Sequence, residues 1–342
     1  MSIRVLIVDD SPTMRALLSE LLRRESDIEV VGTAVDAADA RAQMRSLNPD
    51  VVTLDIEMPG MGGLDFLEKI IRLRPTPVVI VSGLTRDGAD ATARALSIGA
   101  VDCYAKPQGR AGELLTSDGG KLADLIRAAA MVRNAPRQAK APAPVMPSLG
   151  TARGAARLIA IGASTGGVEA LQQLLTRFPA DCPPVAVVQH INGHFAEAVA
   201  RRLDAQCAAR VVIAEPDVTM QRGHIYLAGG NERHLQVRSG SQLYTRVRPG
   251  EKVGGHRPSV DVLFHSVAET LGADAVGILL TGMGSDGARG LLAMARAGAQ
   301  TIVQDEATCT VFGMPKAAIA LGAAGVVAPI HQIADYALAR AA

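Results

Sequence analysis

Residues 157–178 read RLIAIGASTGGVEALQQLLTRF, and this stretch contains the three parts of one βα unit. The apolar run Arg157–Ile161 predicts a buried strand, and apolar residues at helical spacing predict a helix over Val168–Phe178. The small residues between them permit a tight turn at the end of the strand. The stretch therefore indicates an α/β fold built on a parallel sheet.

The N-terminal part of the chain shows the same alternation. Short apolar runs are followed there by amphipathic segments such as Thr13–Arg24 and Gly63–Arg72. Because each run is almost continuously apolar, we expect strands covered on both faces, as in a doubly wound parallel sheet. The five predicted strands are Arg4–Val8, Glu29–Thr33, Asp50–Leu54, Pro77–Val81 and Ala100–Tyr104.

Length and charge predict two domains. The chain has 342 residues, of which 48% are hydrophobic and 20% charged, and this is enough for two packed cores. The net charge is −4 over residues 1–130, +5 over 131–157 and zero over 158–342. The basic middle part is rich in Pro and Ala, which favours a semi-extended linker. We therefore predict doubly wound α/β domains at residues 1–130 and 157–342, joined by a linker over 131–156.

Composition excludes several classes of protein. The overall net charge is +1 and aromatic residues make up only 3%, so we expect no nucleic-acid partner. The chain has no apolar run of about 18 residues and no signal-peptide pattern at its start, so we expect a cytoplasmic protein without membrane insertion. The four cysteines are scattered, which argues against a zinc site and a disulfide framework.

Polar residues follow the predicted strands of the first domain. Asp9 and Asp10 follow the first strand, Asp55 the third, Ser82 the fourth and Lys106 the fifth. Ligands of such sheets bind at the carboxyl ends of the strands, where three carboxylates would repel one another without a cation. Oxygen ligands favour Mg²⁺, and a lysine and a hydroxyl suit an incoming phosphoryl group. The alternative is that these residues cap helices or are solvated.

These motifs resemble the receiver domain of two-component response regulators over about residues 2–125. The resemblance rests on VDDS (8–11), LDIEMPGMGGLDFL (54–67), VSGLT (81–85) and AKP (105–107). It implies a flavodoxin-like fold in which Asp55 is the phosphoacceptor. The implied Mg²⁺ ligands are Asp10, Asp55 and the backbone carbonyl of Glu57, with Asp9 in support. The implied phosphoryl-binding residues are Ser82 and Lys106. The sequence departs from the family at Gly62-Gly63, where many receivers have Asp-Gly, and at Cys103, which replaces the switch aromatic beside Tyr104.

The turn in the opening stretch carries a candidate nucleophile. Residues 162–166, GASTG, fit the pattern G-x-S-x-G, which lifts the Ser164 hydroxyl clear of a sheet at a strand-to-helix turn. The N–H groups at the start of the following helix suit a developing oxyanion. The same turn could instead cradle a phosphate or cap the helix. A P-loop and a Rossmann site are disfavoured because neither GK[ST] nor the spacing of GxGxxG is present.

Two further predicted strands supply a base and an acid. The run Pro184–Val188 is followed by His190, and Ala275–Leu280 is followed by a Gly-rich loop that contains Asp286. Because the carboxyl ends of parallel strands meet at one edge, these residues can join Ser164 in a triad. His190 is favoured over the other histidines because it follows a buried strand.

Other histidines receive different expectations. We expect His224 and His234 to flank a hairpin around the sequence IYLAGGNERH. The segment HRPSVDVLFH (256–265) is expected to form a wall of a substrate cleft.

The whole of residues 157–342 resembles the catalytic domain of CheB-type protein-glutamate methylesterases. The motifs, in order, are IGASTGGVEAL, VVQHI, IYLA, HRPSVDVLF, GILLTGMGSDGARGL and AGAQTIVQDEATCTVFGMP. The resemblance implies phosphorylation-regulated hydrolysis of glutamate γ-methyl esters on chemoreceptors, with methanol released, and deamidation of particular receptor glutamines. The implied partners are the methylated cytoplasmic domains of chemoreceptors and a chemotaxis histidine kinase.

The resemblance also implies roles in the esterase site. Ser164 is the nucleophile, His190 the base and Asp286 the orienting acid. Thr165, Gly166 and Met283 are expected to shape the oxyanion site. No metal or organic cofactor is implied there, and Mg²⁺ belongs to the receiver.

Two alternatives stay open at the level of the sequence. Residues 157–342 could be a docking module, because receivers usually control binding outputs, although docking would not need Ser, His and Asp at three strand ends. The chain could also be a small-molecule esterase with a regulatory receiver. The low aromatic content argues mildly against the apolar acyl pocket of such an enzyme.

Overall fold

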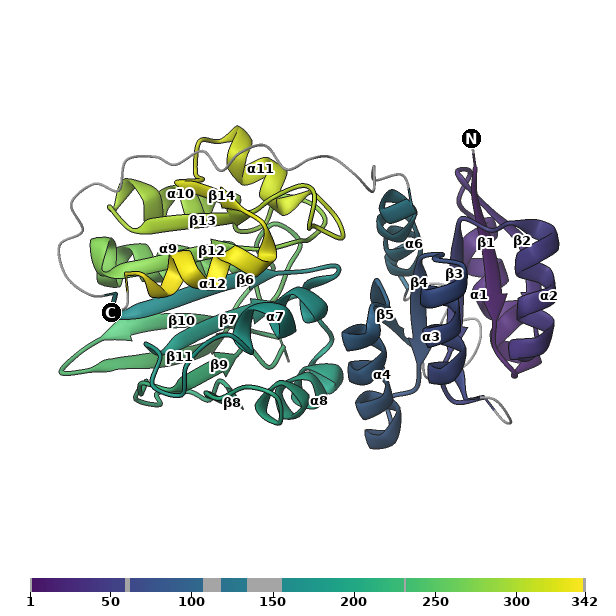
Figure 1. Cartoon of the computed structure of the whole chain (residues 1–342), viewed down its shortest axis with the longest axis horizontal. Coiled ribbons are helices and arrows are strands. Elements are labelled where there is room, and N and C mark those ends of the chain that lie inside the picture. Colours follow the sequence, from purple (N-terminus) through teal and green to yellow (C-terminus); the bar gives the residue numbers. More distant parts are fainter. Residues whose placement is uncertain (1, 59–61, 107–117, 134–155, 231, 341–342) are drawn as a thin grey trace. The chain divides into compact units, whose positions relative to one another are not determined.

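The computed structural model describes residues 2–58, 62–106, 118–133, 156–230 and 232–340. The chain divides between residues 135 and 136 into two compact units, unit 1 and unit 2 (Figure 1). The last helix of unit 1 runs to Arg133, past the expected domain end at residue 130. Most of the expected linker lies outside the described residues.

Unit 1 contains a five-stranded parallel sheet with the order β2-β1-β3-β4-β5, which confirms the flavodoxin-like prediction (Figure 1). Its strands are β1 (Ile3–Val8), β2 (Ile28–Ala34), β3 (Val51–Asp55), β4 (Val78–Ser82) and β5 (Asp102–Ala105). Its described helices are α1 (Pro12–Arg23), α2 (Ala37–Leu47), α3 (Gly63–Leu73), α4 (Arg86–Ile98) and α6 (Lys121–Arg133).

Local sequence fixes where the helices of unit 1 begin. Ser11 caps α1 by accepting a hydrogen bond from Met14 N, and Pro12 starts the helix. Thr85 caps α4 in the same way by accepting from Gly88 N. Because α1 begins so close to the end of β1, Asp9 and Asp10 stay at the carboxyl edge of the sheet.

Unit 2 contains a seven-stranded parallel sheet with the order β14-β13-β12-β6-β7-β9-β8 and a separate two-stranded hairpin, β10-β11. The sheet strands are β6 (Leu158–Ala163), β7 (Val185–Gln189), β8 (Arg210–Ile213), β9 (His224–Leu227), β12 (Ala275–Leu279), β13 (Gln300–Gln304) and β14 (Val326–Ala328). The hairpin strands are β10 (Arg233–Ser239) and β11 (Leu243–Pro249). The doubly wound α/β prediction is confirmed here too.

The helices of unit 2 lie in two layers on opposite faces of the sheet. Helices α7 and α12 contact each other on one face, whereas α9 contacts α10 and the β10-β11 hairpin on the other (Figure 1). None of the described helices could cross a membrane. The α-helices of this unit are α7 (Gly167–Leu175), α8 (Gly193–Asp204), α9 (Val260–Leu271), α10 (Ala288–Arg296), α11 (Met314–Ala320) and α12 (Ile330–Leu338).

The prediction of a hairpin flanked by His224 and His234 is wrong. His224 begins β9, which pairs in parallel with β7 and β8, whereas His234 lies in β10, whose antiparallel partner is β11. The physical reason is visible in the burial of the two strands. Three successive residues of β9 are buried, as in a parallel strand covered on both faces, whereas β10 has one solvated side.

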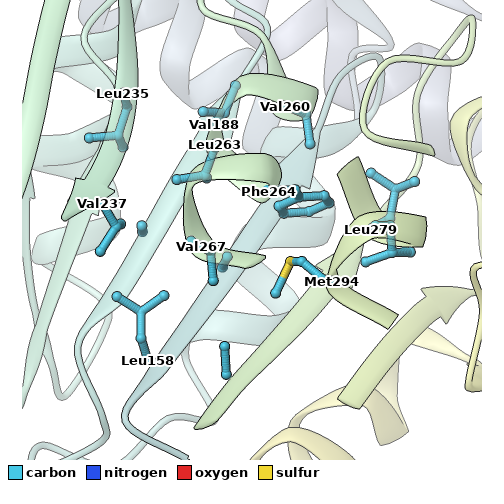
Figure 2. Close-up of a cluster of buried hydrophobic side chains, with 14 of the residues drawn as sticks. Leu158, Val188, Leu235, Val237, Val260, Leu263, Phe264, Val267, Leu279 and Met294 are labelled. Atoms are coloured by element: carbon cyan, nitrogen blue, oxygen red, sulfur yellow. The ribbon is translucent and has the colours of Figure 1, made fainter. Parts of the chain in front are cut away.

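One hydrophobic core of unit 2 fills the space between the sheet, helix α9 and the hairpin (Figure 2). Phe264 of α9 is fully buried at the centre of this cluster. Strand residues such as Leu158 and Leu279 and hairpin residues such as Val237 pack into the same cluster. This packing fixes α9, whose first turn reaches the carboxyl edge of the sheet.

Replacing Phe264 with Ala should therefore lower the free energy of unfolding of unit 2 by about 3–5 kcal/mol, because a large buried ring is removed. Amide hydrogen exchange of β6 and β12 in the intact chain measures this loss. Leu321→Ala is the control, since that side chain is 47% exposed and its loss should cost less than about 0.5 kcal/mol. Equal effects of the two substitutions would contradict the central place of Phe264.

Candidate functional sites

Ser164 and His190 lie side by side at the carboxyl edge of the unit 2 sheet. Strands β6 and β7 pair in parallel with Ala163 opposite Gln189, so the next residues on the two strands are Ser164 and His190. His190 N donates a hydrogen bond to Ala163 O at 3.0 Å. Gln189 links the ends of β6 and β7, because its Nε2 donates a hydrogen bond to Ser164 O at 2.8 Å. The sequence gives no recognisable signal for this role.

Asp286 approaches the same edge from the loop after β12. His190 Nε2 lies 2.8 Å from Asp286 Oδ2, and the two side chains are 10% and 1% exposed. Because an ionised carboxylate only accepts hydrogen bonds, Nε2 must carry the proton of the imidazole. His190 Nδ1 is buried and has no hydrogen-bond partner among the described residues. The lone pair of His190 is therefore on Nδ1, available to a proton donor.

The first turn of α9 holds the carboxylate of Asp286. Burial by itself would raise the pKa of Asp286, but the hydrogen bond and charge of His190, together with backbone N–H donors, lower it to about 2. Four donors bind the carboxylate in addition to His190: Ser259 Oγ at 2.8 Å, Val260 N at 2.7 Å, Asp261 N at 3.1 Å and Gly287 N at 3.0 Å. A helix N-terminus favours an anion, so Asp286 stays ionised.

Residues 259–261, part of the segment expected to form a cleft wall, thus bind the carboxylate of Asp286. Ser259 is the N-cap of α9 and accepts a hydrogen bond from Val262 N. The sequence does carry a signal for that cap, because a serine precedes an amphipathic apolar run. That signal locates a helix start but does not indicate which acid binds there.

The turn around Ser164 is packed closely on both sides. Gly166 adopts φ = 74° and caps α7, and a side chain at this position would overlap with Thr310. A Cβ on Gly282 would lie 2.6 Å from the Cβ of Ser164. Ser164 is 8% exposed, and no hydrogen bond joins its Oγ to His190 in the described part of the chain. Hydrogen bonds of this kind are often long in unliganded enzymes and tighten with substrate.

The residues expected at the oxyanion site surround this turn. Thr165 is buried beside Ser164, and Gly166 precedes the first residue of α7. Met283 is half-buried in the loop after β12, whose Thr281 O accepts a hydrogen bond from Ser164 N at 3.0 Å. Their roles toward an oxyanion stay predictions.

A second histidine, His256, stacks on His190. The two ring centroids are 4.0 Å apart, and the ring planes differ by 4°. Burial, followed by the charges of His190 and Lys252, lowers the pKa of His256 to about 4 against the opposing effect of Asp286. The sequence places His256 in the expected cleft wall and gives no sign of a role toward the base.

Unit 1 has its own polar site at the carboxyl edge of its sheet. The carboxylate oxygens of Asp9, Asp10 and Asp55 lie within 4.8 Å of one another. Lys106 Nζ lies 2.6 Å from Asp55 Oδ2 and 3.0 Å from Asp9 Oδ2. Burial and the charge of Asp55 raise the pKa of Asp9 although Lys106 opposes them. One lysine does not neutralise three carboxylates, so the site suits a cation.

The other residues predicted for this site also lie at strand ends. Ser82 ends β4 beside β3, and its buried hydroxyl donates to Gly88 O at 3.2 Å. Glu57 follows Asp55 and its backbone N donates to Asp55 Oδ1 at 3.0 Å. Tyr104 is buried and its hydroxyl donates to Asp118 Oδ1 at 2.6 Å.

Acidification from pH 6.5 to pH 4 should lower the stability of unit 2. The unfolded chain protonates His256 with its ordinary pKa of 6.5, whereas the folded pKa is about 4. Within this window the unfolded state binds more protons, so stability rises with pH and this contribution is complete above pH 6.5. Hydrogen exchange of β6 and β12, corrected for intrinsic rates, measures the effect. His256→Phe should remove this part of the pH dependence; an unchanged dependence would contradict the prediction.

Comparisons with known proteins match both units. A family model for the CheB methylesterase matches residues 159–337, and one for the response regulator receiver domain matches residues 5–117. A protein-glutamate methylesterase/protein-glutamine glutaminase of Agrobacterium fabrum (strain C58) is 52% identical over 339 residues, covering 97% of this chain and 95% of that protein. A Caulobacter vibrioides (strain CB 15) protein of the same name, numbered 1, is 51% identical over 328 residues, covering 94% and 93%.

A solved structure agrees with these matches. The crystal structure of the Thermotoga maritima CheB methylesterase catalytic domain is 31% identical, covers 54% of this chain and 98% of that chain, and superimposes with a TM-score of 0.52. The family match includes the positions of Ser164, His190 and Asp286. Both resemblances seen in the sequence are thereby confirmed, and the chain belongs to the CheB methylesterase family, with a receiver domain ahead of the methylesterase domain.

Proposed function

We propose that unit 2 hydrolyses γ-methyl esters of glutamate on chemoreceptors, with release of methanol, and converts particular receptor glutamines to glutamate. The observation that carries this proposal is the orientation of His190, whose Nε2 is bound to Asp286 while its buried Nδ1 is unpartnered among the described residues. The names of the relatives give both activities. A docking module would not need a base oriented in this way.

The first half of the reaction forms an ester on the protein. Ser164 Oγ attacks the carbonyl carbon of the substrate, and His190 Nδ1 takes up the proton of the hydroxyl. Asp286 accepts the Nε2 hydrogen bond throughout and stabilises the imidazolium that forms. His190 then protonates the leaving methoxide, and methanol departs. The glutamyl group is left on Ser164.

The second half removes that group. His190 Nδ1 accepts a proton from water, which attacks the glutamyl ester, and the returned proton restores the Ser164 hydroxyl. In both halves the negative oxygen of the tetrahedral intermediate needs N–H donors. We propose that the start of α7 with Thr165 and Gly166 supplies them and that Met283, in the loop after β12, helps to shape the same site.

One covalent intermediate explains two activities. A methyl ester and a primary amide of the same glutamyl side chain differ only in the leaving group, methanol or ammonia. His190 protonates either one, and the glutamyl ester on Ser164 is identical in both cases.

Unit 1 regulates this activity through Asp55, which accepts a phosphoryl group from a chemotaxis histidine kinase. Lys106, already 2.6 Å from Asp55, neutralises the incoming oxygens, and the Ser82 hydroxyl binds one of them. Mg²⁺ fits the site because its donors are oxygens with excess negative charge. Asp10, Asp55 and the Glu57 carbonyl would hold the ion, with Asp9 in support. The ion supplies neutralisation of charge during phosphoryl transfer.

Ser164→Ala should reduce methanol release from methylated receptor by at least about 10³-fold, because no oxygen remains to form the covalent intermediate. Methanol release by the purified protein measures this. Ser241→Ala is the matched control, since Ser241 is exposed in the β10-β11 turn. If the folded Ser164→Ala protein kept the rate of the control, the nucleophile would be another residue.

Asp55→Asn should abolish stimulation by a small phosphodonor and leave basal hydrolysis within about twofold, because an amide does not accept a phosphoryl group. Lys106 keeps its ion pair with Asp9, so unit 1 should stay folded. Methanol release with and without phosphodonor is the measurement, and Asp65→Asn, on the exposed face of α3, is the control. Stimulation that persisted in Asp55→Asn would move the phosphorylation site elsewhere.

A further inference from the structure

The ring stacked on the proposed base is held by its own local structure. Val253 and His256 exchange two backbone hydrogen bonds of 3.0 Å across a two-residue turn. Gly254 and Gly255 form the turn with φ of 60° and 86°, a conformation that suits glycine. His256 therefore enters the site from a tight turn rather than from a loose loop.

The stack restricts tilting of the His190 ring, which the hydrogen bond to Asp286 alone would permit. A single bond at Nε2 fixes one atom of the His190 ring but permits the ring to tilt around that atom. A parallel ring at 4.0 Å blocks tilting on that side. The stack thereby limits how far Nδ1 can move relative to Ser164, which follows the neighbouring strand.

The charge of His256 matters as much as its shape. During the reaction His190 becomes an imidazolium, and a second cation at 4.0 Å would oppose that step. The charged groups that act on His256 are His190, Lys252 and Asp286. The pKa of His256 is about 4, so the ring is neutral at neutral pH. A neutral aromatic face accommodates a cation stacked on it.

We propose that His256 is a positioning residue for the general base: its neutral ring holds the His190 imidazole in the plane that presents Nδ1 to Ser164 and permits that imidazole to become charged. The proposal rests on the function proposed above. It assigns His256 no contact with substrate.

Three substitutions of His256 separate shape from charge. Phe keeps a flat neutral ring, Ala removes the ring, and Arg supplies a flat group that is always charged. His224→Ala is the matched control, because His224 also stacks on an aromatic ring, that of Tyr226 at 6.1 Å, on strand β9. The full-length proteins are compared by methanol release from methylated receptor over a range of pH, and hydrogen exchange shows that each is folded.

We expect His256→Phe to keep kcat within about threefold and His256→Ala to lose about 10–100-fold in kcat with little change in KM. His256→Arg should lower the plateau of kcat/KM and move its acid limb to lower pH, because a fixed cation disfavours the imidazolium. A merely structural residue would not move the acid limb. An Ala variant with unchanged kcat, or an Arg variant with an unchanged pH profile, overturns the proposal.

A second measurement does not depend on the activity. The imidazole resonances of His256 should titrate near pH 4 in the wild-type protein, and His190→Gln should move that titration to higher pH because the neighbouring cation is gone. An unchanged His256 titration in His190→Gln means that the rings do not interact, which overturns the proposal. If the titrations behave as expected while wild-type protein releases no methanol, the proposed function fails and the coupling of the two rings stands.

Discussion

The buried carboxylate of Asp286 is the interaction on which the esterase site depends. A buried carboxylate is tolerated only when it is fully hydrogen-bonded. Five donors, from the start of α9, from the loop that carries Asp286 and from His190, bind it. Each of those donors is held in place by the same carboxylate. The start of α9, the loop after β12 and the imidazole of His190 are therefore positioned together, and loss of one partner would leave an uncompensated buried charge.

The order of strands explains how three distant parts of the chain reach that carboxylate. Strand β6 lies between β12 and β7, so Ser164 has the Asp286 loop on one side and His190 on the other. Unit 1 uses the same geometry for another chemistry. Its central strands β1, β3 and β4 bring acids and a serine to one edge, and Lys106 follows β5. In both units the carboxyl edge gathers side chains that no local segment could bring together.

Apolar runs and the residues at their ends are the features of this chain that can be predicted from its sequence. Buried strands are continuously apolar, so β6, β7 and β12 could be located, and with them Ser164, His190 and Asp286. The donors to Asp286 could not, because they depend on how the first turn of α9 meets a loop some 25 residues later. The hairpin was predicted around β9 instead of at β10-β11 for a related reason. A short apolar run such as β9 is compatible with a parallel strand and with a hairpin strand alike. The stack of His256 on His190 joins two loops and leaves no periodic signal at all.

The imidazoles of His190 and His256, whose ring centroids are 4.0 Å apart, have the same chemistry. Their surroundings must therefore give them different properties. If both rings became charged, each proton would oppose the other, and in the proposed mechanism only one of them serves as the base. Asp286 hydrogen-bonds to His190 directly, whereas burial and then the charges of His190 and Lys252 lower the pKa of His256 although Asp286 opposes them. The same buried anion that fixes the loops thus also makes the two rings unequal, and in the proposed mechanism His190 is the ring that takes the proton.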